Sequence, residues 1–476
     1  MPSPFCSNLL GIGCFSHKLQ DTQKQFLGVI TFFYGDIEMA GKIKKMLDQI
    51  IETRSKGDYF LEQITKTKLI IKGINPDKYH DNSPDTPKIM QDVRRIAQQL
   101  GVTLQKEPVS IKPVYSMETS PEKNAAELAA KLSDISATFV LFFASSNFEP
   151  AALGAAMQAH FPTAIIMGCT TAGEIANEKM LKNSVVAMAF DAETLEDVAV
   201  GVVQNLSTEN QVPQVFADFE RHTGQKMIDL DIKAYVGLAL IDGLSLSEEK
   251  VMDKIGDLTD VLFVGGSAGD DLKMKATYVF ANGEAYTNAA VLALLKPKVN
   301  FEVIKTQSFR ALDKVFKATR VNEAERIVYE FDGQPASKVY AQAVGLPIEE
   351  AGSKFFGQPL GLMVGDEPYV RAPGGIQDDA MMFFCQIKEG MELSLLEATN
   401  IIEDTRSLIQ TKKAELQQIS GLIHFHCLAR TVVLEEQGQM EEYAGIFADI
   451  PTVGFCTYGE QYLGHVSETS TMLLFT

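Results

Sequence analysis

One short pattern occurs twice in this sequence and constrains the fold more than any other feature. Gly-x-x-Thr-x-Gly-Glu spans residues 168–174 and again residues 454–460. Both copies follow the same series of expected elements, which is an apolar strand, a helix, a proline break and a second apolar strand. The strands are expected at Thr138–Ala144 and Thr163–Met167 in the first series, and at Gly421–Cys427 and Val453–Cys456 in the second. The sequence therefore predicts two parallel β-α-β units with right-handed crossovers, in two related halves of one chain.

The fold class expected from this pattern is α/β, with two related modules built largely from parallel β-α-β units and a small helical unit at the N-terminus. A chain of 476 residues has room for two to four domains of roughly 100–200 residues each. Helical periodicity marks residues 35–72 and Lys88–Leu100, and an apolar, β-prone run marks Phe26–Phe33. The predicted divisions are a poorly ordered terminus over 1–25, a mainly helical accessory unit over 26–108, an N-terminal module over 109–318 and a C-terminal module over 319–476.

The charge and composition of the chain exclude several classes of protein. There are 43 Lys and Arg residues against 62 Asp and Glu residues, so the formal net charge is −19 and no basic stripe suits a nucleic acid. No apolar run approaches the length of about 18 residues that a membrane-spanning helix needs. The first 25 residues lack the positively charged start of a secretory signal, and the six cysteines are scattered without a Cys-x-x-Cys pair. We therefore expect a reduced, cytoplasmic protein that binds no nucleic acid and has no membrane span.

Polar side chains gather where the predicted parallel strands end, and the ligands of open parallel sheets collect at such carboxyl ends. The glycines of the repeated motif allow close backbone approach, the threonines add hydroxyls and the glutamates add carboxylates. Arg371 and Arg430 would supply positive charge for the carboxylate of a ligand. The alternative is that each Gly-Glu only turns the chain, with the glutamate capping a helix N-terminus. The predicted ligand-binding residues are Asn147, Gly168, Cys169, Thr170, Thr171, Gly173, Glu174, Arg371, Arg430, Tyr458, Gly459 and Glu460.

A second glycine cluster and a histidine pair admit two interpretations each. Gly265–Asp271 follows an apolar strand like a phosphate-binding loop, but it has no lysine at the spacing of a P-loop, so a tight turn is favoured. His424 and His426 alternate with apolar residues along a predicted strand, so both side chains point to one face. This spacing suits a pair of metal ligands, but a hydrogen-bonded pair between sheet and helix is favoured.

An enzyme is the less favoured functional class, although three thiols lie near the ends of predicted strands. Cys169, Cys427 or Cys456 would be the nucleophile, and His426 would be the activating base. The sequence contains no Gly-x-Ser-x-Gly elbow and no His-Glu-x-x-His motif, and no third orienting residue is evident. We therefore expect a binding protein without catalytic residues. A Cys-dependent enzyme and an interaction scaffold without a ligand are the alternatives.

Seven segments of the chain carry a family resemblance. They are Phe142–Met157, Phe161–Ile175 and Gly265–Asp271 in the first half, and Phe331–Ala336, Pro359–Gly361, Tyr369–Arg371 and Thr457–Glu460 in the second. The first three resemble the N-terminal module of the FIST sensory domain, and the other four resemble its C-terminal module. The resemblance covers residues 112–476, so the modules predicted over 109–318 and 319–476 are identified as FIST modules.

The resemblance implies a sensory, ligand-binding role in signal transduction, at a site shared by the two FIST modules. Small ligands such as amino acids are proposed for the family, and one branch binds haem and senses nitric oxide. Gly459–His465 resembles that branch, which makes His465 the candidate ligand of a haem iron. His426 and Ser467-Glu468-Thr469 depart from the family pattern, which has Asn and Asn-Gln-Thr there. The chain has no kinase or GGDEF-type segment, so the implied partner is a separate histidine kinase or cyclic-di-GMP enzyme.

Overall fold

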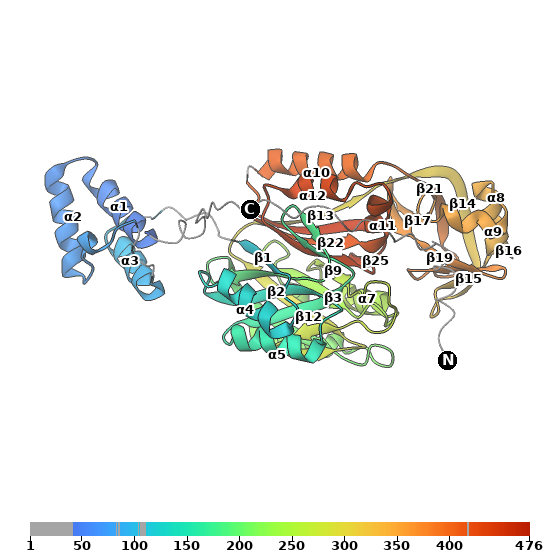
Figure 1. The fold of residues 1–476 in the computed structure, drawn as a ribbon, viewed down its shortest axis with the longest axis horizontal. Coiled ribbons are helices and arrows are strands. Elements are labelled where there is room, and N and C mark those ends of the chain that lie inside the picture. The colour runs from blue at the N-terminus through green and yellow to red at the C-terminus, as the bar shows by residue number, and fades with distance from the viewer. Residues whose placement is uncertain (1–40, 82, 84–85, 103, 105–110, 417) are drawn as a thin grey trace, which may run out of the picture. The chain divides into compact units, whose positions relative to one another are not determined.

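The computed structural model describes residues 41–81, 83, 86–102, 104, 111–416 and 418–476. These residues belong to two compact units, Met1–Pro108 and Val109–Thr476, whose elements are labelled in Figure 1. The predicted terminus over 1–25 and the predicted strand at Phe26–Phe33 lie outside the described residues. No helix in the described part of the chain is both long and apolar enough to cross a membrane.

The smaller unit is helical, as the periodicity of its sequence predicts. Within the described residues its helices are α1 (Lys42–Ser55), α2 (Tyr59–Ile71) and α3 (Pro87–Gln99), with a 3-10 turn at Pro76–Lys78. The single helix predicted over 35–72 is wrong, because Lys56 and Gly57 take left-handed backbone angles and end α1. Asp58 then caps α2 by accepting a hydrogen bond from the backbone N–H of Leu61. Apolar side chains from all three helices form the core of this unit.

The larger unit contains three six-stranded sheets. The first sheet contains, in spatial order, β1 (Lys112–Ser116), β6 (Val185–Asp191), β2 (Ala137–Ser145), β3 (Ile165–Thr171), β10 (Val279–Ala281) and β11 (Glu284–Tyr286). The second contains β7 (Leu195–Val203), β12 (Ala290–Pro297), β8 (Val236–Ile241), β9 (Phe263–Ser267), β24 (Glu460–Tyr462) and β25 (His465–Val466). The third contains β13 (Phe301–Gln307), β26 (Thr469–Phe475), β22 (Gly421–Cys427), β23 (Thr452–Thr457), β4 (Glu174–Ala176) and β5 (Lys179–Leu181).

The three six-stranded sheets share one pattern of parallel and antiparallel pairs. The third and fourth strands are parallel, and all other neighbours are antiparallel. Helices connect each parallel pair, and they are α5 (Pro150–His160), α7 (Glu248–Leu258), and α11 (Leu428–Glu436) with α12 (Met440–Ala444). The two β-α-β units expected from the sequence are confirmed as β2-α5-β3 and β22-α11-α12-β23. A third unit, β8-α7-β9, lies between them in the sequence.

The hairpin that follows each parallel pair leaves its own sheet and joins another sheet. After β3 the chain enters β4–β5, which pairs with β23 in the third sheet. After β9 it enters β10–β11, which pairs with β3 in the first sheet. After β23 it enters β24–β25, which pairs with β9 in the second sheet. The three sheets therefore interlock in a cycle, and the chain leaves each sheet through a crossing loop that begins within residues 168–174, 265–271 or 454–460, where a parallel strand ends.

Each sheet turns one face toward a shared central core and is covered by helices on the other face (Figure 1). Phe143 of the first sheet contacts Phe425 and Phe455 of the third, with ring centroids 6.3 and 4.6 Å apart. The covering helices are α4 (Pro121–Lys131) and α5 on the first sheet, α6 (Val212–Thr223) and α7 on the second, and α10 (Ile401–Leu416), α11 and α12 on the third. Burial on both faces explains why the central strands are continuous apolar runs in the sequence.

A fourth, antiparallel sheet is inserted between β13 and α10 and has its own core around Phe331, Tyr340 and Leu395. Its strands are β14 (Phe309–Asn322), β15 (Ile327–Phe331), β16 (Gln334–Pro335), β17 (Leu360–Val364), β18 (Glu367–Arg371), β19 (Pro373–Gln377), β20 (Ala380–Phe383) and β21 (Glu392–Ala398). The helices α8 (Ala336–Val344) and α9 (Ile348–Ala351) accompany it. The predicted module boundary between residues 318 and 319 falls inside β14.

Candidate functional site

The three crossing loops of the larger unit meet in its interior, so the structure brings both copies of the repeated motif together. The backbone N–H of Ala172 donates to the carbonyl of Cys456 at 3.1 Å, and the N–H of Cys456 donates to the carbonyl of Gly173 at 2.7 Å. The third loop joins them, because the N–H of Gly269 donates to the carbonyl of Thr170 at 2.9 Å. The second glycine cluster is therefore a turn packed against the two motif loops.

Glu174, in the first copy of the motif, is buried and fully hydrogen-bonded. Its Oε1 is bonded to the hydroxyl of Thr171, while its Oε2 accepts from the backbone N–H and the hydroxyl of Ser184 at 3.1 and 2.6 Å. Burial raises the pKa of Glu174 to about 7, although these hydrogen bonds oppose the rise. Both carboxyl oxygens are thus used by Thr171, the last residue of β3, and by Ser184, the residue just before β6.

Glu460, in the second copy, has the equivalent set of partners. Its Oε1 accepts from the hydroxyl of Thr457 at 2.5 Å, and its Oε2 accepts from the backbone N–H and the hydroxyl of Thr469 at 3.1 and 2.7 Å. Burial raises the pKa of Glu460 to about 7 as well. Each glutamate holds the turn that leads from its parallel strand into the following hairpin, which is close to the turn-forming alternative that the sequence left open.

Asn147 and Tyr458, two further predicted residues, hold the loop that follows the second glycine cluster. The Oδ1 of Asn147 accepts a hydrogen bond from Nζ of Lys273 at 2.6 Å. The hydroxyl of Tyr458 donates to Oδ1 of Asp270 at 2.5 Å and accepts from the backbone N–H of Leu272 at 2.7 Å. These contacts bring Asn147 and Tyr458 to one loop, residues 270–273.

The three thiols of the enzyme alternative are buried. Burial raises the pKa of Cys169 and of Cys427 well above the ordinary value, and raises the pKa of Cys456 to about 12. A thiol that keeps its proton is a poor nucleophile. The ring of His426 is hydrogen-bonded to the hydroxyl of Tyr443 at 3.0 Å rather than to one of these thiols. Geometry and ionisation therefore both disfavour these cysteines as nucleophiles.

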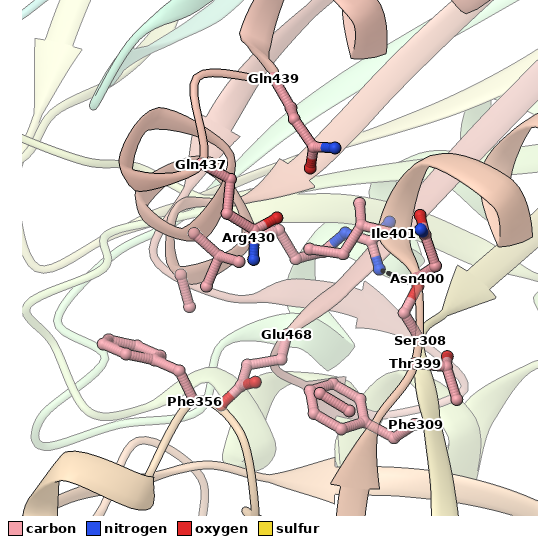
Figure 2. Close-up of a pocket in the computed structure, with 13 residues that line it drawn as sticks. Ser308, Phe309, Phe356, Thr399, Asn400, Ile401, Arg430, Gln437, Gln439 and Glu468 are labelled. Carbon is pink, nitrogen blue, oxygen red and sulfur yellow. Dashed lines mark hydrogen bonds between the residues drawn. The ribbon is translucent and has the colours of Figure 1, made fainter.

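A cavity of about 190 Å³ lies where β22 ends and α11 begins, at the carboxyl end of a parallel strand (Figure 2). Arg430, in the first turn of α11, and Glu468, just before β26, line it from different sides. The start of α10 also borders the cavity, where Asn400 caps the helix by accepting from the backbone N–H of Ile402 at 2.9 Å. The lining residues are Ser308, Phe309, Phe356, Ala398, Thr399, Asn400, Ile401, Ala429, Arg430, Val433, Gln437, Gln439 and Glu468.

Arg430 and Glu468 are nearly buried, yet they are not paired with each other. Each residue is only 3% exposed. Arg430 donates to the hydroxyls of Ser308 at 3.4 Å and Thr405 at 3.1 Å, while its Nε has no hydrogen-bond partner. Burial raises the pKa of Glu468 well above its ordinary value, against the opposing effect of Arg430. A buried polar atom without a partner is costly, so a ligand that bonds to both side chains would be favoured here.

A buried polar network lies behind Arg430. The hydroxyl of Tyr443 is 3.0 Å from Nδ1 of His426 and 3.4 Å from Nε2 of His424, which is itself 2.5 Å from the hydroxyl of Ser470. Burial and the charge of Arg430 lower the pKa of His424 to about 3 and lower that of His426 well below its ordinary value. Both imidazoles are therefore neutral. They face Tyr443 from one side of β22, as the alternation in the sequence predicts.

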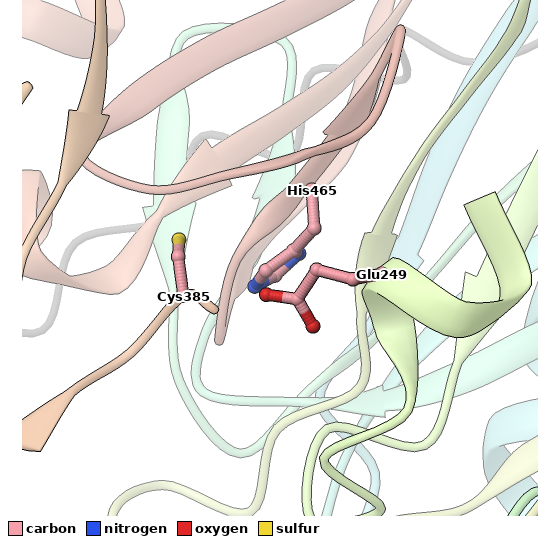
Figure 3. Close-up of side chains that lie close together, drawn as sticks. All are labelled: Glu249, Cys385 and His465. Carbon is pink, nitrogen blue, oxygen red and sulfur yellow. The ribbon is translucent and has the colours of Figure 1, made fainter. Parts of the chain in front are cut away.

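His465, the candidate haem ligand, is enclosed by protein. Its side chain is 3% exposed, and a Cβ added to Gly459 would meet the ring Cε1 at 2.3 Å. Glu249 and Cys385 lie beside the ring (Figure 3), and Arg371 donates to the carbonyl of His465 at 3.5 Å. Burial lowers the pKa of His465, but the charges of Cys385 and Glu249 outweigh burial and raise it to about 9. A haem iron needs an open face at the ligating nitrogen, so haem does not fit at His465 in this structure.

Arg430 is the predicted ligand-binding residue that lines this cavity, and several of its neighbours were not predicted. Asn400 has a local signal, because Thr-Asn before an amphipathic run is typical of a helix N-terminus. Glu468 has a weaker signal, which is its departure from the FIST pattern. Ser308 has none, because its place beside Arg430 depends on the way distant segments fold together.

The structure is an α/β fold with a small cavity lined by polar side chains, and comparison with known proteins identifies its family. A FIST N domain matches residues 138–334 and a FIST C domain matches residues 336–463, together more than half of the chain. The chain therefore belongs to the FIST family, whose domains are sensory domains for small ligands. It is similar to an uncharacterized protein of Methanocaldococcus jannaschii, with 25% identity over 297 residues. That match covers 58% of this chain and 57% of the relative, so the chain spans little more than half of the relative's length.

Proposed function

We propose that this FIST protein senses a small zwitterionic ligand, of the amino-acid type, in the cavity between Arg430 and Glu468. The observation that carries the proposal is a nearly buried guanidinium whose Nε has no hydrogen-bond partner, beside the nearly buried carboxyl group of Glu468, to which it is not hydrogen-bonded. A guanidinium group recognises a carboxylate through paired hydrogen bonds, and a carboxylate recognises an ammonium group. A volume of about 190 Å³ suits a small metabolite better than a drug-sized molecule.

The cavity draws on both matched domains, which supports a shared site. Ser308 and Phe309 fall within the FIST N match, while Phe356 and Arg430 fall within the FIST C match. Two helices, α10 and α11, begin at the cavity, so a bound ligand would contact the first turns of both helices and change their positions. We infer that this movement changes the contact with a separate partner. A histidine kinase or a cyclic-di-GMP enzyme is the class of partner that the family resemblance implies, and the protein itself would bind without catalysis.

Replacing Arg430 with glutamine is expected to weaken ligand binding by about 10–100-fold, because one charge-assisted hydrogen-bonded contact is lost. A thermal-shift screen of amino acids would identify the ligand, and isothermal titration calorimetry would measure its affinity. Glu468→Gln should reduce the preference for an amino acid over the matching acid without the amine.

The matched control for this experiment is Arg406→Gln, on the surface of α10, where Arg406 pairs with Glu442 at 2.8 Å. This variant should bind the ligand as the natural chain does. The proposal is wrong if no amino acid stabilises the protein, or if the folded Arg430→Gln variant binds with unchanged affinity.

Haem is expected not to bind at His465, because the imidazole is enclosed on the side of Gly459 and beside Cys385. An absorption titration of the protein with haem measures this directly, and we expect no saturable Soret band. A saturable band near one haem per chain that disappears in His465→Ala would contradict this expectation. It would instead place the protein in the haem-binding branch of the family.

A further inference from the structure

Glu249, Cys385 and His465 come from three different segments of the larger unit and lie together in its interior (Figure 3). Glu249 is in the first turn of α7, Cys385 lies in the loop between β20 and β21, and His465 is in β25. The thiol sulfur, one imidazole nitrogen and one carboxylate oxygen all lie within 4.8 Å of one another. The ligand cavity and the repeated motif include none of these three residues.

The imidazole of His465 is the least satisfied member of this cluster. Neither of its ring nitrogens makes a hydrogen bond of ordinary geometry, although the residue is 3% exposed, and the thiol of Cys385 is the polar group that interacts with the ring. Buried polar groups in folded proteins are almost always bonded, and an unbonded one calls for an explanation such as an absent ion. Cys385 is fully buried beside it. Two atoms that could act as ligands therefore face each other without solvent.

We propose that Glu249, Cys385 and His465 bind a zinc ion, independently of the ligand proposed above. Sulfur, imidazole nitrogen and carboxylate oxygen are the donor types that zinc takes in proteins. Bond lengths of about 2.0–2.3 Å place tetrahedral donor atoms about 3.3–3.8 Å apart. Donors that already lie within 4.8 Å of one another need only small side-chain movements to reach this geometry. The thiolate and the carboxylate together balance the double charge of the ion.

The groups that would orient the zinc ligands are already in place. Glu249 accepts a hydrogen bond from Arg326 at 2.6 Å through Oε2 and one from the backbone N–H of Gln386 at 2.5 Å through Oε1. Arg326 also forms an ion pair with Glu248, whose Oε2 lies 2.6 Å from Nη2 of the arginine. The thiol of Cys385 lies 3.4 Å from the hydroxyl of Ser467. Ligating side chains in metalloproteins are held by such outer contacts.

The burial of Cys385 favours a metal over a nucleophile, because a sulfur without exposed surface cannot meet a substrate. The side chain of Glu249 is 15% exposed, so solvent reaches the cluster on the side of this residue. The ion would join α7 and β25 to the β20–β21 loop, and so attach the fourth sheet to the rest of the larger unit. Because His465 precedes Glu468 by three residues, the ion would also steady one wall of the ligand cavity.

The test uses the full chain, stripped of metal with a chelator and then titrated with zinc against a chromophoric competitor. We expect one zinc ion per chain, bound at least about 100-fold more weakly in Cys385→Ser, His465→Gln and Glu249→Gln. Cobalt in place of zinc should give a thiolate-to-cobalt charge-transfer band in the natural chain, and this band should be lost in Cys385→Ser.

Cys456→Ser is the matched control, because this buried thiol contacts Thr431 at 3.2 Å and lies outside the cluster. It should bind zinc with the affinity of the natural chain. Circular dichroism establishes which variants fold. If Cys385→Ser does not fold, the cobalt band of the natural chain alone tests the proposal. The proposal is overturned if that band is missing, or if folded cluster variants retain zinc as tightly as the natural chain.

Discussion

Replacing Gly265 with alanine is expected to destabilise the larger unit by more than about 3 kcal/mol, enough to prevent much of the protein from folding. Gly265 lies in β9 directly beside Ala239 of β8, and an added Cβ would be 1.8 Å from the carbonyl oxygen of Ala239. The other side of β9 is occupied by β24, with Gln461 opposite Gly265. The strand cannot move away from one neighbour without being pushed into the other, so the methyl group separates a parallel pair at the centre of the fold.

Circular dichroism during urea unfolding measures this loss, since the chain contains no tryptophan for fluorescence. The control is Gly256→Ala in α7, where no atom lies within 4 Å of the added Cβ and the site is exposed. Alanine is the better helix former, so this variant should be more stable by up to about 1 kcal/mol. A Gly265→Ala protein that unfolds within about 1 kcal/mol of the natural chain would contradict the close strand contact.

The same strand pair shows how far the fold could be predicted from the sequence. The units around Thr138–Ala144 and Gly421–Cys427 are recognisable because apolar strands, a helix and a proline follow one another locally. The middle unit has the same strand order, but its crossing loop, residues 265–271, does not share the Thr-x-Gly-Glu ending. The exchange of hairpins between sheets involves residues far apart in the chain, and periodicity carries no information about it.

In the candidate site, too, some residues can be predicted from their local sequence, and others depend on distant segments that fold together. Arg430 could be predicted, because it stands at the end of a parallel strand where ligands collect. Its partners in the cavity come from positions near 308, 400 and 468, and only the third sheet and its insertion bring them together. The motif glutamates were expected to face a ligand. In the structure, hydroxyl groups of the protein itself bond to both oxygens of Glu174. The glutamate is therefore repeated because the same turn occurs in both halves of the fold.

Raising the pH from about 5 to about 8 is expected to destabilise the larger unit through Glu174 and Glu460. Burial raises the pKa of each carboxyl from the ordinary 4.5 to about 7. Below pH 4.5 both the folded and the unfolded chain hold these protons. Between pH 4.5 and 7 the unfolded chain releases them first, so the stability that they contribute falls and is lost above pH 7. The shift corresponds to about 3 kcal/mol for each carboxyl.

Glu174→Gln isolates this effect, because an amide has the shape of the carboxyl group but cannot ionise. Its oxygen can accept from Ser184, and its NH2 group can donate to the hydroxyl of Thr171, which then donates to the carbonyl of Ala144. We expect the variant to match the natural chain near pH 5 and to be more stable than it by about 3 kcal/mol near pH 8. Urea unfolding followed by circular dichroism at both pH values measures the difference. Glu284→Gln, exposed on the corresponding hairpin β10–β11, is the matched control and should leave the pH dependence unchanged. If Glu174→Gln is instead destabilised equally at both pH values, the carboxyl is ionised throughout and its hydrogen bonds hold a charge.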